Sequence, residues 1–479
     1  MFYQLHQGKE HGIDVDQIPG GVQLVIAPDS SSNEEEVHKQ LKELGIDVLI
    51  LDHHNADNYS EYACTINNQM CDYPNKSLSG VGIVYKFCQY LDSLLGQNFA
   101  DNILDLVALG MIADMVDIRP LETKRLLDKG LQNIQNPFFK QMVIKNEFSL
   151  GENITPIGVA FYIAPAINAV SRVGSAADKQ LLFEAMLDHK ADELIESTKR
   201  GCKGEMESRV EQACRNCTNL KNQQNRLRDT ELERIEHIIE RNKLLDNKIL
   251  IIKLDNSINP NLTGLLANNL ANKYQRPCLV LYQGVDDEGR HVWRGSGRNC
   301  NGTEFDNLQA FLLDSNYFTL AQGHDNALGV GILVEDLDPF IQYSNEALKN
   351  CNFEPVYHVD FILDGPQLND NMILQIASLQ GYWGQKMPEP YIAIRDLRLT
   401  DTNLDLLKGT TLKITLNNKN TSLIKFKSSE EEFFELVPRY QGGCTVVDVV
   451  GKCTINSWNN QPQIKIEDYE ITAYEKFYF

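Results

Sequence analysis

The sequence lacks any continuous run of about 18 apolar residues, the length that a helix needs to cross a bilayer, so no membrane partner is expected. Its first residues show no basic segment followed by an apolar core, so no secretory signal peptide is expected. Positive charge is scarce, because 45 Lys and Arg stand against 66 Asp and Glu and leave a net charge of −21. A field of this sign repels nucleic acid. The composition therefore argues against a protein that covers DNA non-specifically. It does not argue against an enzyme whose bound cations make the local charge positive.

The cysteines form no paired framework. They number 11, an odd count, and are scattered along the chain. In a chain without a signal peptide this usage is typical of reduced thiols in the cytoplasm. One Cys-x-x-Cys pair, Cys214 and Cys217, lies in a charged stretch typical of a helix and has no second pair at zinc spacing. We therefore expect a cytoplasmic protein in which this pair has no metal or redox role.

The length of 479 residues is enough for about three domains. The pattern predicts the α/β class, with a parallel sheet in the first domain, and contains no low-complexity segment or solenoid repeat. A polar stretch without proline predicts a long linker helix, and several short β-like runs near the C-terminus predict a small Greek-key barrel. The expected parts are a catalytic α/β domain at 1–190, the linker helix at 191–247, a smaller α/β domain at 248–352 and the barrel at 353–479.

Residues 22–54 follow the order strand, helix, strand. Two apolar runs, VQLVIAPD and IDVLILDHH, flank a segment with serines and acids at its start and a glycine at its end. These patterns are typical of buried parallel strands joined by a helix. Ligands of such sheets bind beyond the carboxyl ends of the strands. The side chains at these ends are Asp29, Asp52, His53 and His54.

These four side chains suit a hard divalent cation. Carboxylates and imidazole favour Mn²⁺ or Mg²⁺ over metals that prefer thiolates. Farther along, MIADMVDI places Asp114 in an apolar setting, where a carboxylate is costly unless it is paired or bound to a metal. The alternative is a solvated loop with a chance pair of histidines. The additional carboxylate favours the metal site.

Several motifs, taken in order, resemble the DHH phosphoesterase superfamily. LILDHH is followed by TINNQMCDYPNKSLSGVGIVYKF and ALGMIADMVDI, and FYIAPAINAVSRVG is similar to the RecJ branch of that superfamily. RGSGRN at 294–299 and QGHDNALGVGI at 322–332 resemble the DHH-associated domain, and VDVVGKCTINSWNN resembles the RecJ-type OB domain. The tripeptide DHH alone is a weak signal, but the ordered motifs cover nearly the whole chain.

The resemblance implies a single-strand-specific 5′ to 3′ DNA exonuclease that uses two divalent metals and acts in recombination or repair. By the family pattern, Asp29, His53 and Asp114 are metal ligands, His54 faces the scissile phosphate, and Asp52 supports the site. The chemistry of the residues agrees, because two cations about 3.5–4 Å apart can activate a water and stabilise the leaving oxygen. Single-stranded DNA is the expected partner, with a single-strand-binding protein or a helicase as further candidates.

The segment RGSGRN predicts a phosphate-binding site. Gly295 and Gly297 permit a close backbone approach, and Arg298 can grip a phosphate with paired donors. A plain glycine turn between strands is the alternative, and the resemblance favours phosphate binding. It also implies substrate contacts for Ser296 and for His324, although Gln322 stands where the family usually has a glycine before that histidine.

Two further sets of residues have open interpretations. Asn168 and Arg172 are polar residues in an apolar setting, and they either steer DNA or cap a helix. In the barrel-like region, charge and one aromatic face could serve single-stranded bases. An ordinary barrel surface with a buried tryptophan is the alternative, and it is slightly favoured for the tryptophan. The candidates are Lys413, Lys425, Lys427 and Trp458.

One motif of the family, an Asp-x-Asp-Gly at the tip of the first strand, is not found. Asp14 and Asp16 match the Asp-x-Asp part of this motif, but no apolar strand precedes them and no helix follows them. We therefore interpret them as unrelated to the motif. Truncation and natural loss both remain open. We expect this chain to hold about one cation, to cleave on the order of 10³-fold more slowly than a two-metal enzyme, and to expose a sheet edge.

Two other functions remain open. DHH-type phosphodiesterases also cleave short oligonucleotides or cyclic dinucleotides, and a relative that lost a metal site could bind nucleic acid without cleaving it. The long linker and the barrel-like end favour polymer DNA, because an enzyme for a small substrate would not need a barrel to hold distant nucleotides.

Overall fold

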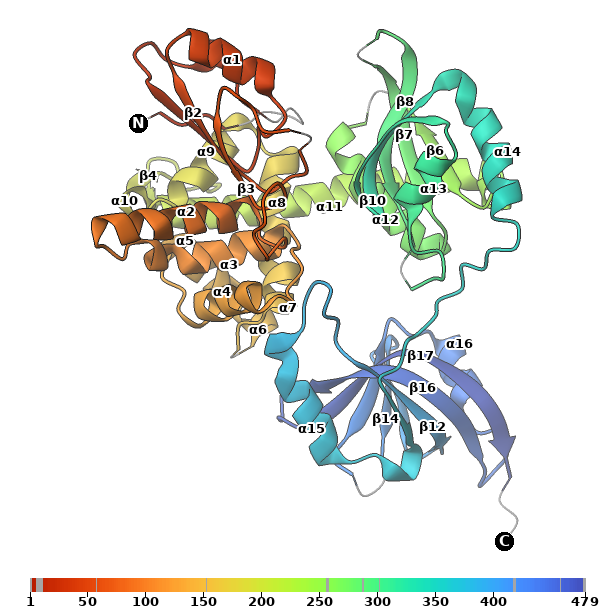
Figure 1. Ribbon diagram of the computed structural model, residues 1–479. Coiled ribbons are helices and arrows are strands. Elements are labelled where there is room, and N and C mark those ends of the chain that lie inside the picture. The colour runs from red at the N-terminus through yellow and green to blue at the C-terminus, as the bar shows by residue number, and fades with distance from the viewer. Residues whose placement is uncertain are drawn as a thin grey trace. The chain divides into compact units, whose positions relative to one another are not determined.

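The computed structural model (Figure 1) comprises two compact units. Unit 1 consists of residues 1–168, 176–215 and 358–479, and unit 2 consists of residues 169–175 and 216–357. The residues that the structure describes are 2–5, 12–56, 58–151, 153–255, 258–286, 288–300, 302–416, 419–456 and 458–476.

Unit 1 begins with a three-stranded parallel sheet in the order β1-β2-β3. Helix α1 joins the first two strands, so the strand–helix–strand prediction for residues 22–54 is confirmed. The face of the sheet that packs on α1 is an apolar cluster built around Leu41, Val48 and Ile50. Strand β1 lies at the sheet edge, and its Leu24 and Ile26 are each 51% exposed. The bounds are β1 Leu24–Pro28, α1 Glu35–Glu43, β2 Asp47–Asp52 and β3 Cys64–Asn67.

A set of helices follows the sheet, and α2 lies against β1 and β2. Helix α3 is buried along most of its length and ends at Asp114. Among the described residues, the stretch Pro156–Val173 is long and apolar enough to cross a membrane, although the sequence analysis expected no such helix. Of this stretch, 39% is buried, and the core helix of a soluble protein can have the same length and composition. The bounds are α2 Gly80–Leu95, α3 Leu104–Ala113, α4 Leu121–Gln132, α5 Pro137–Lys145, α6 Glu147–Leu150, α7 Pro156–Gly158, α8 Ala164–Val173, α9 Ala176–Ala185 and α10 Asp188–Ala191.

The linker helix is shorter at its start than predicted. Residues 194–208 form a two-stranded hairpin, β4 (Leu194–Glu196) and β5 (Met206–Ser208), and helix α11 runs only over Arg209–Arg241. Gly201 and Gly204 adopt φ values of +87° and +84°, a backbone conformation that glycine reaches without steric cost. These two glycines turn the chain back on itself, so a helix from residue 191 is wrong.

A buried carboxylate ties the start of the chain to helix α9. Glu184 accepts hydrogen bonds from Lys190 Nζ at 2.6 Å, Tyr3 Oη at 2.7 Å and Arg209 Nη1 at 2.5 Å. The bond from Lys190 contributes most, and together the donors outweigh burial and hold the pKa of Glu184 at about 2. The carboxylate is therefore ionised across the physiological range.

Replacing Glu184 with glutamine should lower the free energy of unfolding by about 2 kcal/mol near neutral pH, because charged hydrogen bonds are lost. Since the pKa in the folded state is below the ordinary value, the stabilisation is present above pH about 4.5 and disappears as the pH falls toward 2. Urea titrations of both proteins at several pH values measure this difference. Glu193→Gln is the control, since Glu193 is exposed and contacts the same Arg209 from outside. Equal losses for both variants at all pH values would contradict the prediction.

Unit 2 is built on a five-stranded sheet in the order β6-β7-β8-β10-β9. Strands β6 and β7 are parallel, and the remaining neighbours are antiparallel. One face packs on α12 and the second half of α11, and the other packs on α13 and α14. The bounds are β6 Leu250–Leu254, α12 Thr263–Tyr274, β7 Cys278–Val285, β8 His291–Arg298, α13 Leu308–Asp314, β9 Phe318–His324, β10 Ala327–Leu333 and α14 Leu337–Ala347.

The C-terminal strands form a single seven-stranded sheet, not the closed barrel that we expected. The order is β11-β12-β16-β17-β15-β14-β13, and the edge strands β11 and β13 do not pair with each other. Two helices, α15 and α16, cover the apolar cluster instead. The bounds are β11 Phe361–Asp364, α15 Asp370–Ser378, β12 Tyr391–Leu399, β13 Leu404–Leu407, β14 Thr411–Thr415, β15 Ser422–Phe426, α16 Glu430–Leu436, β16 Cys444–Ile455 and β17 Pro462–Glu475.

Candidate metal centre and anion site

The carboxyl ends of the parallel strands bring the expected metal ligands together. Asp29 follows β1 with a φ of +62°, and its N–H donates to Leu51 O at 2.9 Å, which fixes the turn. His53 follows β2, and its Nε2 lies 3.1 Å from Asp29 Oδ1 and 3.6 Å from Asp114 Oδ2. One ligand atom each of Asp29, His53 and His54 lie within 4.8 Å of one another. Side chains from three separate segments thus converge on one small volume.

The setting of Asp114 differs from the expectation. The sequence predicts a carboxylate in an apolar environment, whereas its side chain is 45% exposed at the end of α3. The helix buries its apolar residues up to Ile112 and then stops, so the carboxylate emerges at the rim of the cluster. The buried carboxylate is Asp52, whose side chain is 1% exposed.

Asp52 holds the loop after β2 in place. It accepts hydrogen bonds from Ser32 Oγ at 2.7 Å, from the His53 N–H at 2.7 Å and from His54 Nδ1 at 2.8 Å. Burial by itself would raise the pKa of Asp52, but the hydrogen bonds from His54, Ser32 and His53 outweigh it and lower the pKa. An ionised carboxylate only accepts, so His54 donates from Nδ1 and its Nε2 is left for a ligand. The same bond raises the pKa of His54.

Three neighbours of this cluster, Ser32, Asn67 and Gly80, were not found from the sequence. Asn67, at the end of β3, donates to Ser32 Oγ at 3.0 Å and to the backbone oxygen of His54 at 2.8 Å. Gly80 begins α2 directly against Asp29, and a Cβ built on it would lie 2.2 Å from Asp29 Oδ1. The available signals were weak: Asn67 stands at a strand end, and Gly80 stands at a helix start.

Asp14 and Asp16 have a local role. Asp14 Oδ1 accepts from the Asp16 N–H at 3.1 Å and caps a short turn, Val15–Gln17. Asp14 Oδ2 accepts from Gln17 Nε2 at 2.5 Å. This capping agrees with the interpretation that the two residues do not form the missing motif.

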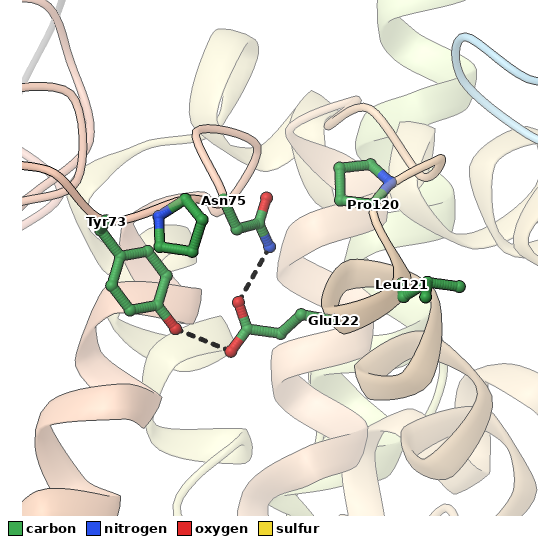
Figure 2. A pocket seen from close by; sticks show the side chains of 6 residues that line it. Tyr73, Asn75, Pro120, Leu121 and Glu122 are labelled. Carbon is green, nitrogen blue, oxygen red and sulfur yellow. Dashed lines mark hydrogen bonds between the residues drawn. The ribbon is translucent and has the colours of Figure 1, made fainter.

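A pocket of about 370 Å³ lies between the loop after β3 and the start of α4, and Figure 2 shows that its polar groups bond to one another. Glu122 accepts from Tyr73 Oη at 2.8 Å and from Asn75 Nδ2 at 3.0 Å, and Lys86 Nζ lies 3.0 Å from its carboxylate. These bonds brace the loop against α4. The pocket contains none of the site residues predicted from the sequence.

A second cluster, in unit 2, contains the expected phosphate-binding residues. Ser296 and Arg298 alternate with glycines on β8 and so share one face of the strand. Ser296 Oγ lies 2.9 Å from Thr263 Oγ1, at the start of α12. A Cβ on Gly264, the next residue, would lie 2.6 Å from Arg298 Nη2. The first turn of α12 therefore lies directly beside the serine and the arginine.

The glycines of RGSGRN serve packing. Gly297 is buried, and a Cβ there would meet the side chains of Leu279 and Leu308. A Cβ on Gly295 would lie 1.9 Å from Val280 O. The free side of Gly297 points into the core, so packing explains the glycine there, and the expected close approach of a phosphate to this backbone stays a prediction.

Arg172 joins the cluster from helix α8. Its backbone oxygen accepts from Asn261 Nδ2 at 3.2 Å, and Asn261 lies just before Thr263 in the chain. Burial lowers the pKa of Arg298, and the neighbouring charge of Arg172 lowers it further. We call Arg172, Ser296 and Arg298 the anion site. Asn168 stands one turn before Arg172 on α8 and is half-buried.

His324 stands two strands away from Arg298 in the same row. Ala327 of β10 pairs with Arg298 on one side and with His324 on the other. Two strand spacings are about 10 Å, so the backbones of Arg298 and His324 lie about that far apart on one face of the sheet. Gly323, directly before His324, has a φ of +138°, a backbone conformation that favours glycine. Gln322, which stands where the family usually has a glycine, has no positive φ.

The C-terminal sheet presents an exposed aromatic residue. Trp458 is 83% exposed, so the interpretation as a buried barrel residue is wrong. It lies in the turn between β16 and β17. Lys425 forms an ion pair with Glu432 at 2.7 Å, which reduces its value as a DNA contact. Lys427 is exposed, and Lys413 is half-buried.

Two family models match the chain. Residues 2–111 match the DHH family N-terminal domain, and residues 359–468 match the RecJ OB domain. A Bacillus subtilis protein named putative SPbeta prophage-derived single-strand DNA-specific exonuclease YorK is 37% identical over 98% of this chain and 82% of its own length. The B. subtilis single-stranded-DNA-specific exonuclease RecJ is 26% identical over 95% of this chain and 55% of its own length.

The fold has a solved counterpart. The crystal structure of RecJ in complex with Mn²⁺ from Thermus thermophilus superposes with a TM-score of 0.70 and 19% identity, over 94% of this chain and 62% of that one. The match to YorK and the match to the RecJ OB domain agree with the order of the motifs along the chain. The chain therefore belongs to the RecJ-like branch of the DHH phosphoesterase superfamily.

Proposed function

We propose that this protein is a metal-dependent exonuclease that hydrolyses single-stranded DNA from the 5′ end and acts in recombination or repair. The chain spans 82% of YorK but only 55% of the B. subtilis RecJ, so the activity of the whole relatives is a proposal for this chain. The observation that carries it is the convergence of Asp29, His53 and Asp114 beside a His54 that Asp52 holds in one orientation.

The donor set fits Mn²⁺ or Mg²⁺. Asp29, His53 and Asp114 would hold the ion, because the two carboxylates lie 3.1 and 3.6 Å from the imidazole nitrogen His53 Nε2. The bound ion would lower the pKa of a water and offset charge on the phosphate. Asp52 keeps His54 Nδ1 protonated, so the Nε2 of His54 is available to a phosphate oxygen.

The anion site supports a polymeric substrate. Arg172 and Arg298 form no ion pair among the described residues, and they lie in a chain whose net charge is −21. Local positive charge of this kind is what an acidic protein needs to attract a nucleic-acid strand. We further propose that the protein works in the cytoplasm with single-stranded DNA, and that a single-strand-binding protein or a helicase supplies the strand.

The test uses the full chain with Mn²⁺ and four substrates: linear single-stranded DNA, the same strand blocked at its 5′ end, circular single-stranded DNA and a dinucleotide. Degradation of the unblocked linear strand alone is expected, because an exonuclease needs a free end. Cleavage of only the dinucleotide would favour a small-substrate phosphodiesterase. Binding of the strand without cleavage of any substrate would favour the catalytically impaired relative.

A further inference from the structure

The turn after helix α3 carries the candidate ligand Asp114 and contains a strained residue. Met115 has a φ of +56°, in the left-handed region where residues other than glycine are strained. Its N–H donates to Ile112 O at 3.1 Å, and the N–H of Val116 donates to Met111 O at 3.2 Å. This pair of bonds is typical of helix ends that have glycine at the position of Met115. With methionine there, the turn itself favours this conformation less, so contacts beyond it become more important.

The chain beyond this turn is held by a loop that precedes strand β12. Residues 383–387, which we call the bridge loop, are closed by an isolated antiparallel pair between Gly384 and Met387. The backbone oxygen of Gln385 accepts a hydrogen bond from the Ile118 N–H at 3.3 Å. Both segments belong to unit 1. The bridge loop therefore contacts the chain just beyond the turn.

Gly384 allows the bridge loop to lie directly on a buried side chain. A Cβ built on Gly384 would lie 2.8 Å from Ile118 Cδ1 and 3.7 Å from Pro156 Cβ. Ile118 is 3% exposed, so its side chain has little room to move aside. Any side chain at position 384 therefore displaces either the loop or Ile118.

Helix α4, which follows the same connection, contacts the chain just before the bridge loop. Lys124 Nζ donates to Gly381 O at 2.5 Å and lies 4.8 Å from the centre of the Tyr382 ring. The side chain of Lys124 is only 13% exposed, and its ammonium also forms an ion pair with Asp128 at 2.7 Å. The segment before β12 is therefore fastened at two points, one on the connection between α3 and α4 and one on α4 itself.

The position of the Asp114 carboxylate depends on the backbone around it. Helix α3 holds the N–H of Asp114, which donates to Gly110 O at 2.9 Å. The side chain is 45% exposed, so burial does little to fix it, yet its Oδ2 lies 3.6 Å from His53 Nε2. The direction in which the chain leaves Asp114 is set by the turn at Met115. Contacts that keep this turn in place therefore also keep the carboxylate beside His53.

We propose that the bridge loop, through Gly384 and Ile118, positions Asp114 for a divalent metal. The segment that leads into the C-terminal sheet is then part of the support of the metal centre. The identification of Asp114 as a metal ligand rests on the proposed function, whereas the contacts between the bridge loop and the connection after α3 do not.

The experiment uses the full chain and combines calorimetric titration with Mn²⁺ and hydrogen exchange of residues 114–118 without metal. Gly384→Ala should weaken Mn²⁺ binding about tenfold, as expected when a residue that orients a ligand is disturbed. The backbone amide of Ile118 should exchange faster in this variant. Adding Ile118→Val removes the Cδ1 atom that the new Cβ meets, so the double variant should recover most of the affinity and the slower exchange.

Gly381→Ala is the matched control, because a Cβ there meets nothing within 4 Å and the residue lies in the same segment. It should bind Mn²⁺ like the parent chain, and the unfolding temperatures of all variants should agree within a few degrees. Unchanged Mn²⁺ affinity of Gly384→Ala would overturn the inference, as would a loss that Ile118→Val does not restore. A parent chain that binds Mn²⁺ in this way but does not degrade single-stranded DNA would overturn the proposed nuclease activity and leave the inference standing.

Discussion

His53→Ala is expected to abolish Mn²⁺-dependent cleavage, with a loss of at least about 10³-fold in rate. The Nε2 of His53 is the atom on which Asp29 and Asp114 converge, at 3.1 and 3.6 Å. Alanine removes the nitrogen donor and leaves two carboxylates to repel each other. The ring lies at a strand tip but is only 17% exposed, so its removal also costs packing, and the folding of the variant has to be checked. Cleavage rates measure the loss of activity, and calorimetric titration with Mn²⁺ measures the loss of metal binding.

The control for this variant is His291→Ala, which removes an exposed histidine at the start of β8. It should keep the parental rate and the parental affinity for Mn²⁺. Circular dichroism and thermal unfolding would establish that both variants fold. If His53→Ala cuts DNA at the parental rate with Mn²⁺, the metal centre is wrongly located.

Gly80→Ala is the second variant for which we expect a large effect, although glycine has no side chain that could bind a metal or a substrate. A Cβ on Gly80 would lie 2.2 Å from Asp29 Oδ1 and 2.6 Å from Asp29 Cγ, so the carboxylate must move. Displacing a ligand by this kind of neighbour should weaken metal binding by about 10–100-fold. Alanine is favoured over glycine inside a helix by roughly 1 kcal/mol, so α2 itself should not be weakened.

The comparison variant is Gly20→Ala, because a Cβ on Gly20 meets nothing within 4 Å. Mn²⁺ titrations of the two variants, together with their unfolding temperatures, separate a metal defect from a folding defect. Gly80→Ala should lose affinity for Mn²⁺ while it keeps its unfolding temperature within a few degrees. Unchanged metal affinity would mean that Asp29 is not a ligand.

The importance of His53 can be predicted from the sequence alone, and the importance of Gly80 cannot. His53 stands in an unmistakable pattern, whereas the effect of Gly80 depends on how α2 meets the turn after β1. Ser32 and Asn67 belong to the second kind, because they act only by bonding to Asp52 and to the loop after it. Residues of this kind act through the neighbours that they hold, and so they give no signal in a single sequence.

The amino-acid sequence by itself determined the α/β class, the strand–helix–strand unit and the placement of Asp29, Asp52 and His53 at strand ends. It could do so because hydrophobic periodicity is local, and because the carboxyl ends of parallel strands always meet at one edge of the sheet. The glycine-rich segment RGSGRN also identified Arg298 as a candidate cation, but not the strand in which it lies.

Only the tertiary structure decided which of these residues meet. Asp114 reaches His53 because α3 ends at the sheet edge, and Arg172 approaches Arg298 because Asn261 and the core of unit 2 hold the end of α8. It also turned Gly297 toward the core and left the C-terminal strands as an open sheet. The physical reason is common to all four: contacts between segments far apart in the chain depend on the packing of whole elements, which no local pattern encodes.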